Sequence, residues 1–418
     1  MATKTIANID VAGKTVLMRV DFNVPLDNGV VTNDKRIVAA LPSIKKVLEG
    51  GAKLVLMSHL GRPKGEVKPE FSLRPAAEKL SEHLGIPVEL GPSDIAGPEA
   101  QKMVADLKPG QVLLLENVRF DPRETSKDPE QMQSFGDELG KLGDIYVNDA
   151  FGTCHRAHAS MYGAAKAIQA KGGPAVAGFL VEKEIKYLHE AVDTPKRPFV
   201  AILGGAKVSD KIKLISSLLN KVDTILIGGA MAYTLLKAKG VEVGTSLVEA
   251  DQVEPMKELL EKAGNKIILP CDHTCTDDFA NGTPVEVEDV NIPENMMGMD
   301  IGPKTIEEFA EIVNAAGTVV WNGPMGVFER DDYAAGTKAV AKACADATSR
   351  GAVSVIGGGD SATAIMKFGL ADKVTHVSTG GGASLTYLEG KPMPPIDVLD
   401  KTEDENTGGC GCSGCCCG

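Results

Sequence analysis

Aromatic residues are scarce in this sequence. Only 4% of its 418 residues are Phe, Trp or Tyr, although 43% are hydrophobic. A core with so few rings has to be packed from Val, Ile, Leu and Ala, which is typical of parallel sheets covered by helices. A chain of this length exceeds one ordinary core, so we expect two or three domains.

Long apolar runs and an excess of basic charge are also lacking. No run reaches membrane-spanning length, and the first 25 residues lack the apolar core of a signal peptide, so we expect a cytoplasmic protein with no membrane partner. The net charge is −13, with 57 acidic residues against 44 Lys and Arg. This balance argues against a nucleic-acid partner, but it permits a local basic cleft.

Cysteines are few outside the end of the chain. The scattered ones, expected to be reduced thiols, are Cys154, Cys271, Cys275 and Cys344. The others crowd residues 408–418, at Cys410, Cys412, Cys415, Cys416 and Cys417. This Cys-rich tail resembles metallothionein-like sequence. We favour a disordered low-complexity extension, and the alternative is a site for a soft metal such as Cu(I) or Zn(II) at Cys410–Cys417.

Short apolar runs alternate with helical patterns along the chain. The pattern predicts strands at Val16–Val24, Lys53–Leu60, Val112–Phe120, Asp144–Phe151, Pro198–Gly205, Thr224–Gly229, Lys266–Pro270, Thr318–Gly323 and Val353–Gly358. It predicts helices at Asp34–Glu49, Ser209–Lys221 with Ser209 as N-cap, and Thr305–Ala316. Such alternation indicates an α/β fold with parallel sheets. Val181–Val192, flanked by Gly-Pro and Pro-rich stretches, is expected to be a helix that joins two α/β halves.

In the first half, charged and amide side chains follow the predicted strands. They are Asp21, Asn23, Arg36, His59, Arg62, Arg119, His155 and Arg156. Ligands of open parallel sheets bind at the carboxyl ends of strands, where these residues would converge. A guanidinium fork matches phosphate and carboxylate groups, so this edge suits a small, highly charged anion.

In the second half, glycines follow the predicted strands instead. The glycine turns are LGGAK (203–207), IGGAM (227–231), IGGGDS (356–361) and STGGG (378–382). Such turns let backbone N–H groups approach an anion closely, so they predict a nucleotide across the sheet edge. None is a Walker A loop, because SVIGGGDSAT (354–363) has no lysine. Asp360 could hold a metal that bridges phosphates, cap the following helix, or do both.

The motifs that carry these residues resemble the phosphoglycerate kinase family over nearly the whole chain, to about Leu399. They are RVDFNVP (19–25), SHLGRP (58–63), ENVRF (116–120), NDAFGTCHRAHAS (148–160), LGGAKVSDK (203–211), WNGPMGVFE (321–329), GGGDSAT (357–363) and STGGGASL (378–385). The resemblance implies a monomer of two Rossmann-like domains, each a parallel sheet flanked by helices. Enzymes of this family interconvert 1,3-bisphosphoglycerate plus ADP with 3-phosphoglycerate plus ATP, in glycolysis or gluconeogenesis, and the resemblance implies the same reaction for this chain.

The resemblance also implies a division of the chain. Residues 1–175 would bind 3-phosphoglycerate, residues 176–195 would form the interdomain helix and hinge, and residues 196–393 would bind the nucleotide. Residues 394–407 would pack back toward the first domain, and residues 408–418 would form the Cys-rich tail.

The family's site residues carry over to matching positions of this sequence. The phosphoglycerate site would comprise Asp21, Asn23, Arg36, His59, Arg62, Arg119 and Arg156. The nucleotide site would comprise Lys207, Lys211, Gly228, Gly229, Gly298, Asn322, Glu329, Gly357, Gly358, Gly359, Asp360 and Ser361, with Asp360 as the Mg²⁺ ligand. The groups nearest the transferred phosphate would be Arg36, Lys207, Gly357 and Gly380. Whether His155 or His158 contacts substrate stays open.

Elementary chemistry supports this assignment. The attacking group would be a carboxylate, which is already ionised at neutral pH, so no general base is needed. Catalysis then consists of positioning and of neutralising the charge on the transferred phosphate, for which Arg, Lys, Mg²⁺ and backbone amides are suited. Water must be excluded by domain closure, because an acyl phosphate would otherwise hydrolyse.

Two other classes of protein share some of these features. A nicotinamide-dependent oxidoreductase would use the G-x-G-x-x-A pattern of Gly357–Ala362, but the acidic residue expected about 20 positions later is missing from THVST at 375–379. A non-catalytic nucleotide-binding or metal-storage protein would explain the tail, but it would leave the arginines of the first half without a role.

Overall fold

The computed structural model describes residues 3–402, which form two compact units. The first unit contains residues 3–150, 156–182 and 394–402, and the second unit contains residues 151–155 and 183–393. The division falls within helix α6 (Phe179–Val192), whose first turn belongs to the first unit. The predictions for the Cys-rich tail at 408–418 lie outside the described residues.

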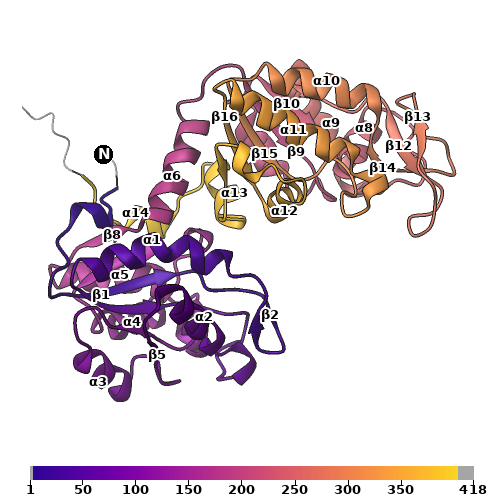
Figure 1. The fold of residues 1–418 in the computed structure, drawn as a ribbon. Coiled ribbons are helices and arrows are strands. Elements are labelled where there is room, and N and C mark those ends of the chain that lie inside the picture. The colour runs from indigo at the N-terminus through magenta and orange to yellow at the C-terminus, as the bar shows by residue number, and fades with distance from the viewer. Residues whose placement is uncertain (1–2, 403–418) are drawn as a thin grey trace, which may run out of the picture. The chain divides into compact units, whose positions relative to one another are not determined.

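The first unit, which carries the labels β1, β5 and β8 in Figure 1, is built on a parallel sheet of six strands. Their order is β5-β6-β4-β1-β7-β8. The strands are β1 (Thr15–Val20), β4 (Lys53–Met57), β5 (Val88–Leu90), β6 (Val112–Leu114), β7 (Ile145–Asp149) and β8 (Ala175–Ala177). In the centre, Leu17 pairs with Val55 of β4 and with Tyr146 of β7. Nearly every residue of β1, β4 and β7 is buried, as expected for parallel strands that are covered on both faces.

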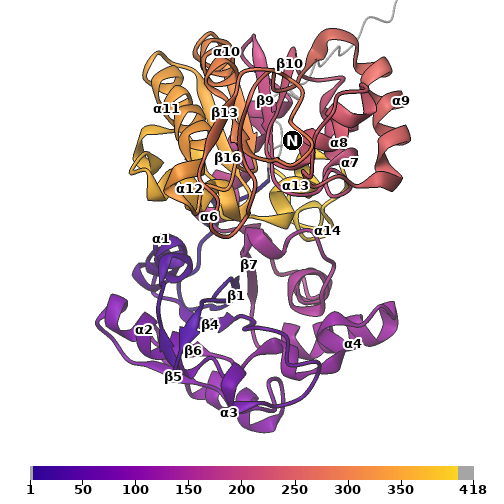
Figure 2. The ribbon, with the colours of Figure 1, turned by 90° about the vertical axis from the view of Figure 1, so that its right-hand side faces the viewer.

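Helices flank this sheet, with α1 packed beside α2 (Figure 2). Helix α4 packs beside α5. The helices are α1 (Lys35–Glu49), α2 (Arg74–Leu84), α3 (Pro98–Asp106), α4 (Pro129–Gly140), α5 (Ala164–Ala170) and α14 (Pro394–Asp397). Strands β2 (Leu26–Asp27) and β3 (Val30–Val31) form a hairpin. Residues 394–402 return to this unit. Lys401 forms an isolated antiparallel β-bridge with Thr3, and the Asn148 side chain donates to the Pro395 carbonyl at 3.0 Å.

The second unit repeats the design with a six-stranded parallel sheet in the order β11-β10-β9-β15-β16-β17. Its strands are β9 (Phe199–Leu203), β10 (Thr224–Ile227), β11 (Ile267–Ile268), β15 (Thr318–Asn322), β16 (Val353–Gly357) and β17 (His376–Val377). Its helices are α7 (Ile212–Leu218), α8 (Met231–Ala238), α9 (Val253–Ala263), α10 (Pro303–Asn314), α11 (Ala335–Ser349), α12 (Gly359–Lys367) and α13 (Gly382–Leu388). The α/β class predicted from strand and helix alternation is confirmed.

Two local expectations were wrong, and one small sheet was missed. Several strands end earlier than predicted, because polar side chains take over the backbone bonds: after β6, Asn117 caps a 3₁₀ turn (Val118–Phe120). Helix α7 is shorter than predicted and has Lys211 as N-cap, since the Ser209 hydroxyl instead donates to Glu249 at 2.5 Å. A small antiparallel sheet of β12 (His273–Thr276), β13 (Val285–Val287) and β14 (Met297–Ile301) was not predicted.

Among residues 3–402, none of the helices is long and apolar enough to cross a membrane.

Candidate active site

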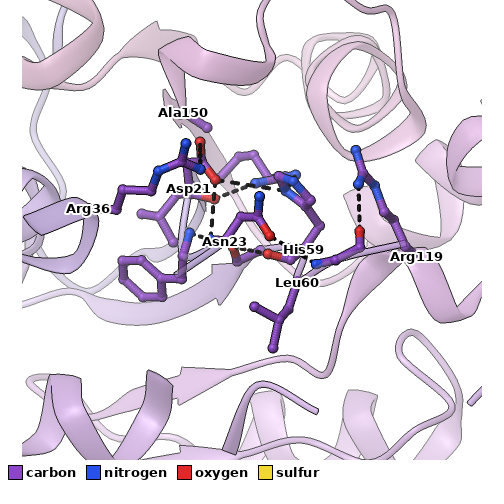
Figure 3. Close-up of polar contacts among 12 residues, drawn as sticks. Asp21, Asn23, Arg36, His59, Leu60, Arg119 and Ala150 are labelled. Atoms are coloured by element: carbon purple, nitrogen blue, oxygen red, sulfur yellow. Dashed lines mark hydrogen bonds and ion pairs between the residues drawn. The ribbon is translucent and has the colours of Figure 1, made fainter. Parts of the chain in front are cut away.

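The polar residues of the first unit gather where β1 and β4 end, because both strands run in the same direction (Figure 3). Asp21 follows β1 directly, and its Oδ2 accepts from Arg36 Nη1 at 2.9 Å. His59 follows β4, and its Nδ1 lies 4.0 Å from Asp21 Oδ1. Asp21 and His59 are buried, whereas the Arg36 side chain is 39% exposed. Asp21 therefore orients an arginine that stays accessible to a ligand.

The backbone of a single residue, Gly61, connects two further members of the predicted phosphoglycerate site. The Gly61 N–H donates to Asn23 Oδ1 at 2.9 Å, and the Gly61 carbonyl accepts from Arg119 Nη1 at 2.7 Å. A side chain at Gly61 would collide with the Phe71 ring, and its φ of +59° is one that L-residues rarely adopt. The loop SHLGRP thus holds the amide and the guanidinium in one arrangement.

Burial and like charge determine the ionisation of this group of residues. Burial holds the pKa of His59 well below its ordinary value, and Arg19, Arg119 and Arg36 lower it further. Burial also lowers the pKa of Arg119 to about 10, with Arg19 acting in the same direction. At neutral pH Arg119 is therefore charged and His59 is neutral, which favours a polyanionic ligand.

Three of the predicted arginines line a cavity of about 300 Å³. Its lining is Arg62, Lys64, Gly65, Arg119, Thr125, Arg156 and His158. Asp21, Asn23, Arg36 and His59 lie outside this lining. Sequence reasoning did not single out Lys64 and Thr125, although the place of Lys64 two residues after Arg62 was a signal. We call this pocket the arginine cavity.

The second unit has a larger cavity, of about 580 Å³, which we call the glycine cavity. Its lining is Gly204, Gly205, Ala206, Lys207, Asp210, Lys211, Asn322, Gly323, Gly358, Gly359, Asp360, Ser361, Gly381, Gly382 and Leu385. These residues follow β9, β15, β16 and β17, so the carboxyl ends of four parallel strands supply the site. Lys207 and Asp360 are exposed on its wall.

Glycine is required at position 358, because the backbone there approaches the Asn322 side chain closely. Gly358 has φ +87°, and a Cβ there would lie 3.1 Å from Asn322 Nδ2. That buried amide nitrogen has no hydrogen-bond partner among the described residues. Asn322 Oδ1 accepts from the Lys211 ammonium. Burial lowers the pKa of Lys211, while Asp210 and Asp360 act in the opposite direction. The cavity therefore holds an unused donor and two lysines, a combination suited to phosphate oxygens.

Ser361 plays a structural part through its hydroxyl group, which accepts from the Gly323 N–H at 2.6 Å. The contact fastens the first turn of α12 to the end of β15, and Ser361 is fully buried. A phosphate contact from this residue would have to come from its backbone N–H, at the N-terminus of the helix.

Several predicted nucleotide residues lie outside the glycine cavity. Gly229 lies beside Gly205, the N–H of Gly298 donates to the Ser246 hydroxyl at 2.9 Å, and Glu329 is exposed. The remaining ones are Gly228 and Gly357, and Gly380, which was predicted to lie near the transferred phosphate, is also outside this lining.

Gly380, in the STGGG turn, is buried within the second unit. A Cβ at this position would collide with the Phe151 ring and with the Ser384 hydroxyl. Its N–H donates to the Ser378 hydroxyl at 3.1 Å. Gly381 and Gly382 line the cavity in its place.

Three residues that line the glycine cavity lie outside both the glycine turns and the predicted site residues. They are Asp210, Gly323 and Leu385. Asp210 lies within the LGGAKVSDK motif and Gly323 within WNGPMGVFE, so their place in these motifs was a signal that could have found them.

Comparison with known proteins agrees with this geometry. The sequence profile of the family described as Phosphoglycerate kinase matches residues 6–391. A relative named phosphoglycerate kinase from Prosthecochloris aestuarii is 56% identical over 405 residues, which are 96% of this chain and 100% of the relative. One from Chlorobium phaeobacteroides is 55% identical over 405 residues, with the same coverage. The chain belongs to the phosphoglycerate kinase family.

Solved structures of phosphoglycerate kinases share this fold. The enzyme from Coxiella burnetii has a TM-score of 0.85 at 40% identity, covering 95% of this chain and 98% of that chain. The enzyme from Pyrococcus horikoshii has a TM-score of 0.81 at 35% identity, covering 96% and 98%. The resemblance carried by the eight motifs is confirmed. As a phosphoglycerate kinase, the chain is a phosphotransferase with a carboxyl group as acceptor, and nothing supports the nicotinamide-dependent alternative.

Proposed function

We propose that this chain transfers the acyl phosphate of 1,3-bisphosphoglycerate to ADP, reversibly, giving 3-phosphoglycerate and ATP. The observation that carries the proposal is the contrast between its two cavities. Three arginines line one cavity in the first unit, and glycine turns with two lysines line the other in the second unit. A small polyanion suits the first cavity, and a nucleotide polyphosphate suits the second.

The first unit would bind the phosphoglycerate. Arg62, Arg119 and Arg156 would hold its phosphate, since their guanidinium groups already line one cavity. Asp21, Asn23, Arg36 and His59 would meet the remainder of the molecule, with Arg36 oriented toward the reacting end by Asp21. The acceptor carboxylate is ionised at neutral pH, so the reaction requires no general base. The lowered pKa of His59 therefore does not affect activation of the acceptor.

The second unit would bind the nucleotide. Lys211, Asn322 and Gly357–Ser361 would meet its phosphates, and Gly228, Gly229, Gly298 and Glu329 would extend the site to the base and ribose. Two observations support the phosphate contacts: Asn322 Nδ2 has no hydrogen-bond partner among the described residues, and Gly358 has a positive φ. Arg36, Lys207 and the turns at Gly357 and Gly380 would neutralise charge on the transferred group as it passes in line between the substrates after closure.

The residues of the glycine cavity also fit a nucleotide-bound Mg²⁺ ion. Asp360 presents an exposed carboxylate beside the turn at Gly358. Among the described residues no three His, Cys, Asp or Glu side chains form a metal site, so phosphate oxygens would have to complete the coordination. Asp360 would hold the ion, which when bound neutralises phosphate charge.

A coupled assay of ATP formation from 1,3-bisphosphoglycerate and ADP tests the proposal. Arg36→Ala should lower kcat by about two orders of magnitude, as is typical when one charge-stabilising group is removed from a transition state. Arg74→Ala, which removes an exposed arginine at the start of α2, is the matched control and should leave turnover unchanged. Absence of turnover in the folded wild-type protein would refute the proposed reaction, and an unchanged rate for Arg36→Ala would remove Arg36 from the mechanism.

We extend the proposal to the oligomeric state of the protein, to its cellular compartment and to its Cys-rich tail. We expect a cytoplasmic monomer, and light scattering on the purified protein would reveal a larger assembly. We also keep the hypothesis that thiolates at Cys410–Cys417 bind a soft metal without a part in catalysis. Metal analysis of the full chain and of a chain ending at Thr407 tests it, because equal metal content would contradict a metal-binding tail.

A further inference from the structure

Glu124 is a fully buried carboxylate beneath the arginine cavity. It lies in the 3₁₀ turn Pro122–Thr125, which follows the ENVRF motif, and the next residue, Thr125, lines the cavity. Neither the sequence motifs nor the mechanism above gives Glu124 a role. A buried carboxylate is costly unless it is hydrogen-bonded and faces positive charge, so its partners show what it does.

Both oxygens of Glu124 bind one serine. Glu124 Oε2 accepts from the Ser160 N–H at 2.8 Å, and Oε1 accepts from the Ser160 hydroxyl at 2.7 Å. Because that hydroxyl donates to Glu124, its lone pairs are available, and it accepts from Arg19 Nε at 2.9 Å. Glu124, Ser160 and Arg19 thus form a directed chain in which a carboxylate acts on a guanidinium through a hydroxyl group.

Arg19 needs such a counter-charge. Its side chain is fully buried, and within residues 3–402 no carboxylate oxygen lies within 4.0 Å of it. Its other nitrogens contact the Val20 carbonyl and His59 Nδ1, the latter at 3.1 Å. The other buried carboxylates of the first unit have other partners. Asp21 pairs with Arg36, Glu116 accepts from the Ser72 hydroxyl and the Leu73 N–H, and Asp149 accepts from the N–H groups of Leu180 and Val181. Glu124 is therefore the buried carboxylate that can act as the counter-charge of Arg19.

The other charges around Glu124 belong to the substrate site. His158 Nδ1 lies 3.8 Å from Glu124 Oε1, and Arg119 also acts on the carboxylate. Burial raises the pKa of Glu124 to about 7, while Arg19, the Ser160 bonds and Arg119 act in the opposite direction. The carboxylate thus faces two cavity-lining residues, His158 and Arg119, as well as the arginine behind them.

We propose that Glu124 is a positioning residue of the phosphoglycerate site, holding Arg19 and His59 in place through the Ser160 hydroxyl and fixing the turn that carries His158. The inference deepens the proposed function and rests on it for the identity of the anion. The direct contacts to substrate would remain those of the arginines, and Glu124 would act through its neighbours.

The direction of the effect separates positioning from simple electrostatics. Removing a negative charge near a cationic cavity would by itself strengthen the binding of an anion. Losing the chain that orients Arg19 and His59 would weaken it, because misplaced groups no longer match the anion. For Glu124→Gln we expect the Kd of 3-phosphoglycerate to rise about tenfold, the loss typical of an outer partner that orients binding residues. The Kd of MgATP should not change.

Isothermal titration calorimetry with 3-phosphoglycerate and with MgATP measures both constants without requiring turnover. Ser160→Ala removes the bridging hydroxyl but leaves the backbone bond, and it decides the matter if Glu124→Gln does not fold. The double variant should be no weaker than either single variant, because both changes break one chain. Glu130→Gln, which alters an exposed carboxylate at the start of α4, is the matched control and should bind as the wild type does.

The outcomes are distinct. A selective rise in the Kd of 3-phosphoglycerate for both single variants supports the inference. An unchanged or lower Kd, an equal loss for both ligands, or additive losses in the double variant overturns it. Failure of the proposed function shows separately, as wild-type protein that forms no ATP in the coupled assay.

Discussion

Replacing Asp149 by asparagine should remove a pH-dependent loss of stability from the first unit. Asp149 is the last residue of β7 and is fully buried. Its Oδ1 accepts from the N–H of Leu180 at 2.9 Å and of Val181 at 3.4 Å, in the first turn of α6. Burial raises its pKa from 3.8 to about 7, against the opposing effect of the Ser43 hydroxyl and these two amides. The folded chain therefore binds this proton more tightly than the unfolded chain does.

The sign and size of the effect follow from linkage. A raised pKa in the folded state gives stability that is complete below pH 3.8 and is lost as the pH rises through about 7. Over the whole window the loss is about 4 kcal/mol, since each pKa unit is worth about 1.4 kcal/mol. Between pH 5 and pH 8 the same relation gives about 2.6 kcal/mol. The amide of the Asp149→Asn variant would stay neutral throughout, and its oxygen can still accept from both backbone N–H groups.

Urea unfolding followed by circular dichroism at pH 5, 6, 7 and 8 measures this difference. The unfolding free energy of Asp149→Asn minus that of the wild type should increase by about 2.6 kcal/mol from pH 5 to pH 8. Other buried acids with raised pKa values, such as Glu124 and Asp300, titrate in both proteins and cancel. Asp106→Asn, an exposed control on α3, should follow the wild-type curve. A constant difference between Asp149→Asn and the wild type would refute the reasoning.

Three further substitutions have defined outcomes. Gly358→Ala forces φ +87° on a residue with a side chain and crowds Asn322, so the Kd of ADP should rise about tenfold in calorimetry; equal affinity would argue against phosphate binding at this turn. Gly380→Ala drives a Cβ into the Phe151 ring, so the unfolding free energy should fall by about 1–3 kcal/mol in urea; unchanged stability would show that the ring moves aside. Ile202→Ala empties a fully buried position beside Trp321, the only tryptophan of the chain, so the unfolding free energy from its fluorescence should fall by about 2–5 kcal/mol; a loss below about 1 kcal/mol would contradict close packing there.

Apolar runs predicted the central strands of both sheets, and their starts agree within a residue or two. β1, β4, β9, β15 and β16 are long and buried on both faces, so their sequences are largely apolar. Their ends were overextended, because the residues that follow are also apolar in part. The short strands β5 and β8 were missed, since three residues carry too little pattern to distinguish a strand from a loop.

The residues of the candidate site also divide into those that the sequence predicted and those that it did not. Arginines and glycines that directly follow strands were found, because chain position alone places them at a sheet edge. Lys64 and Asp210 were not, although each lies close to a predicted site residue in the sequence. Thr125 was not either, because its place at the arginine cavity depends on how the turn Pro122–Thr125 packs. The role of Glu124 depends on Ser160, which lies 36 positions away in the sequence, so no local pattern could pair them.

The alternation of apolar runs and helical patterns was enough to determine the fold class, and the eight motifs, through their resemblance to the phosphoglycerate kinase family, were enough to determine the family and its reaction. These properties depend on residue type and on position relative to a strand, and both can be read along the chain. Tertiary structure alone decided which residues line each cavity, that Ser361 uses its hydroxyl within the fold, and that Arg19, Glu124 and Asp149 are buried. Burial and long-range contact determine the cost of a charge, and both arise only when distant segments pack together.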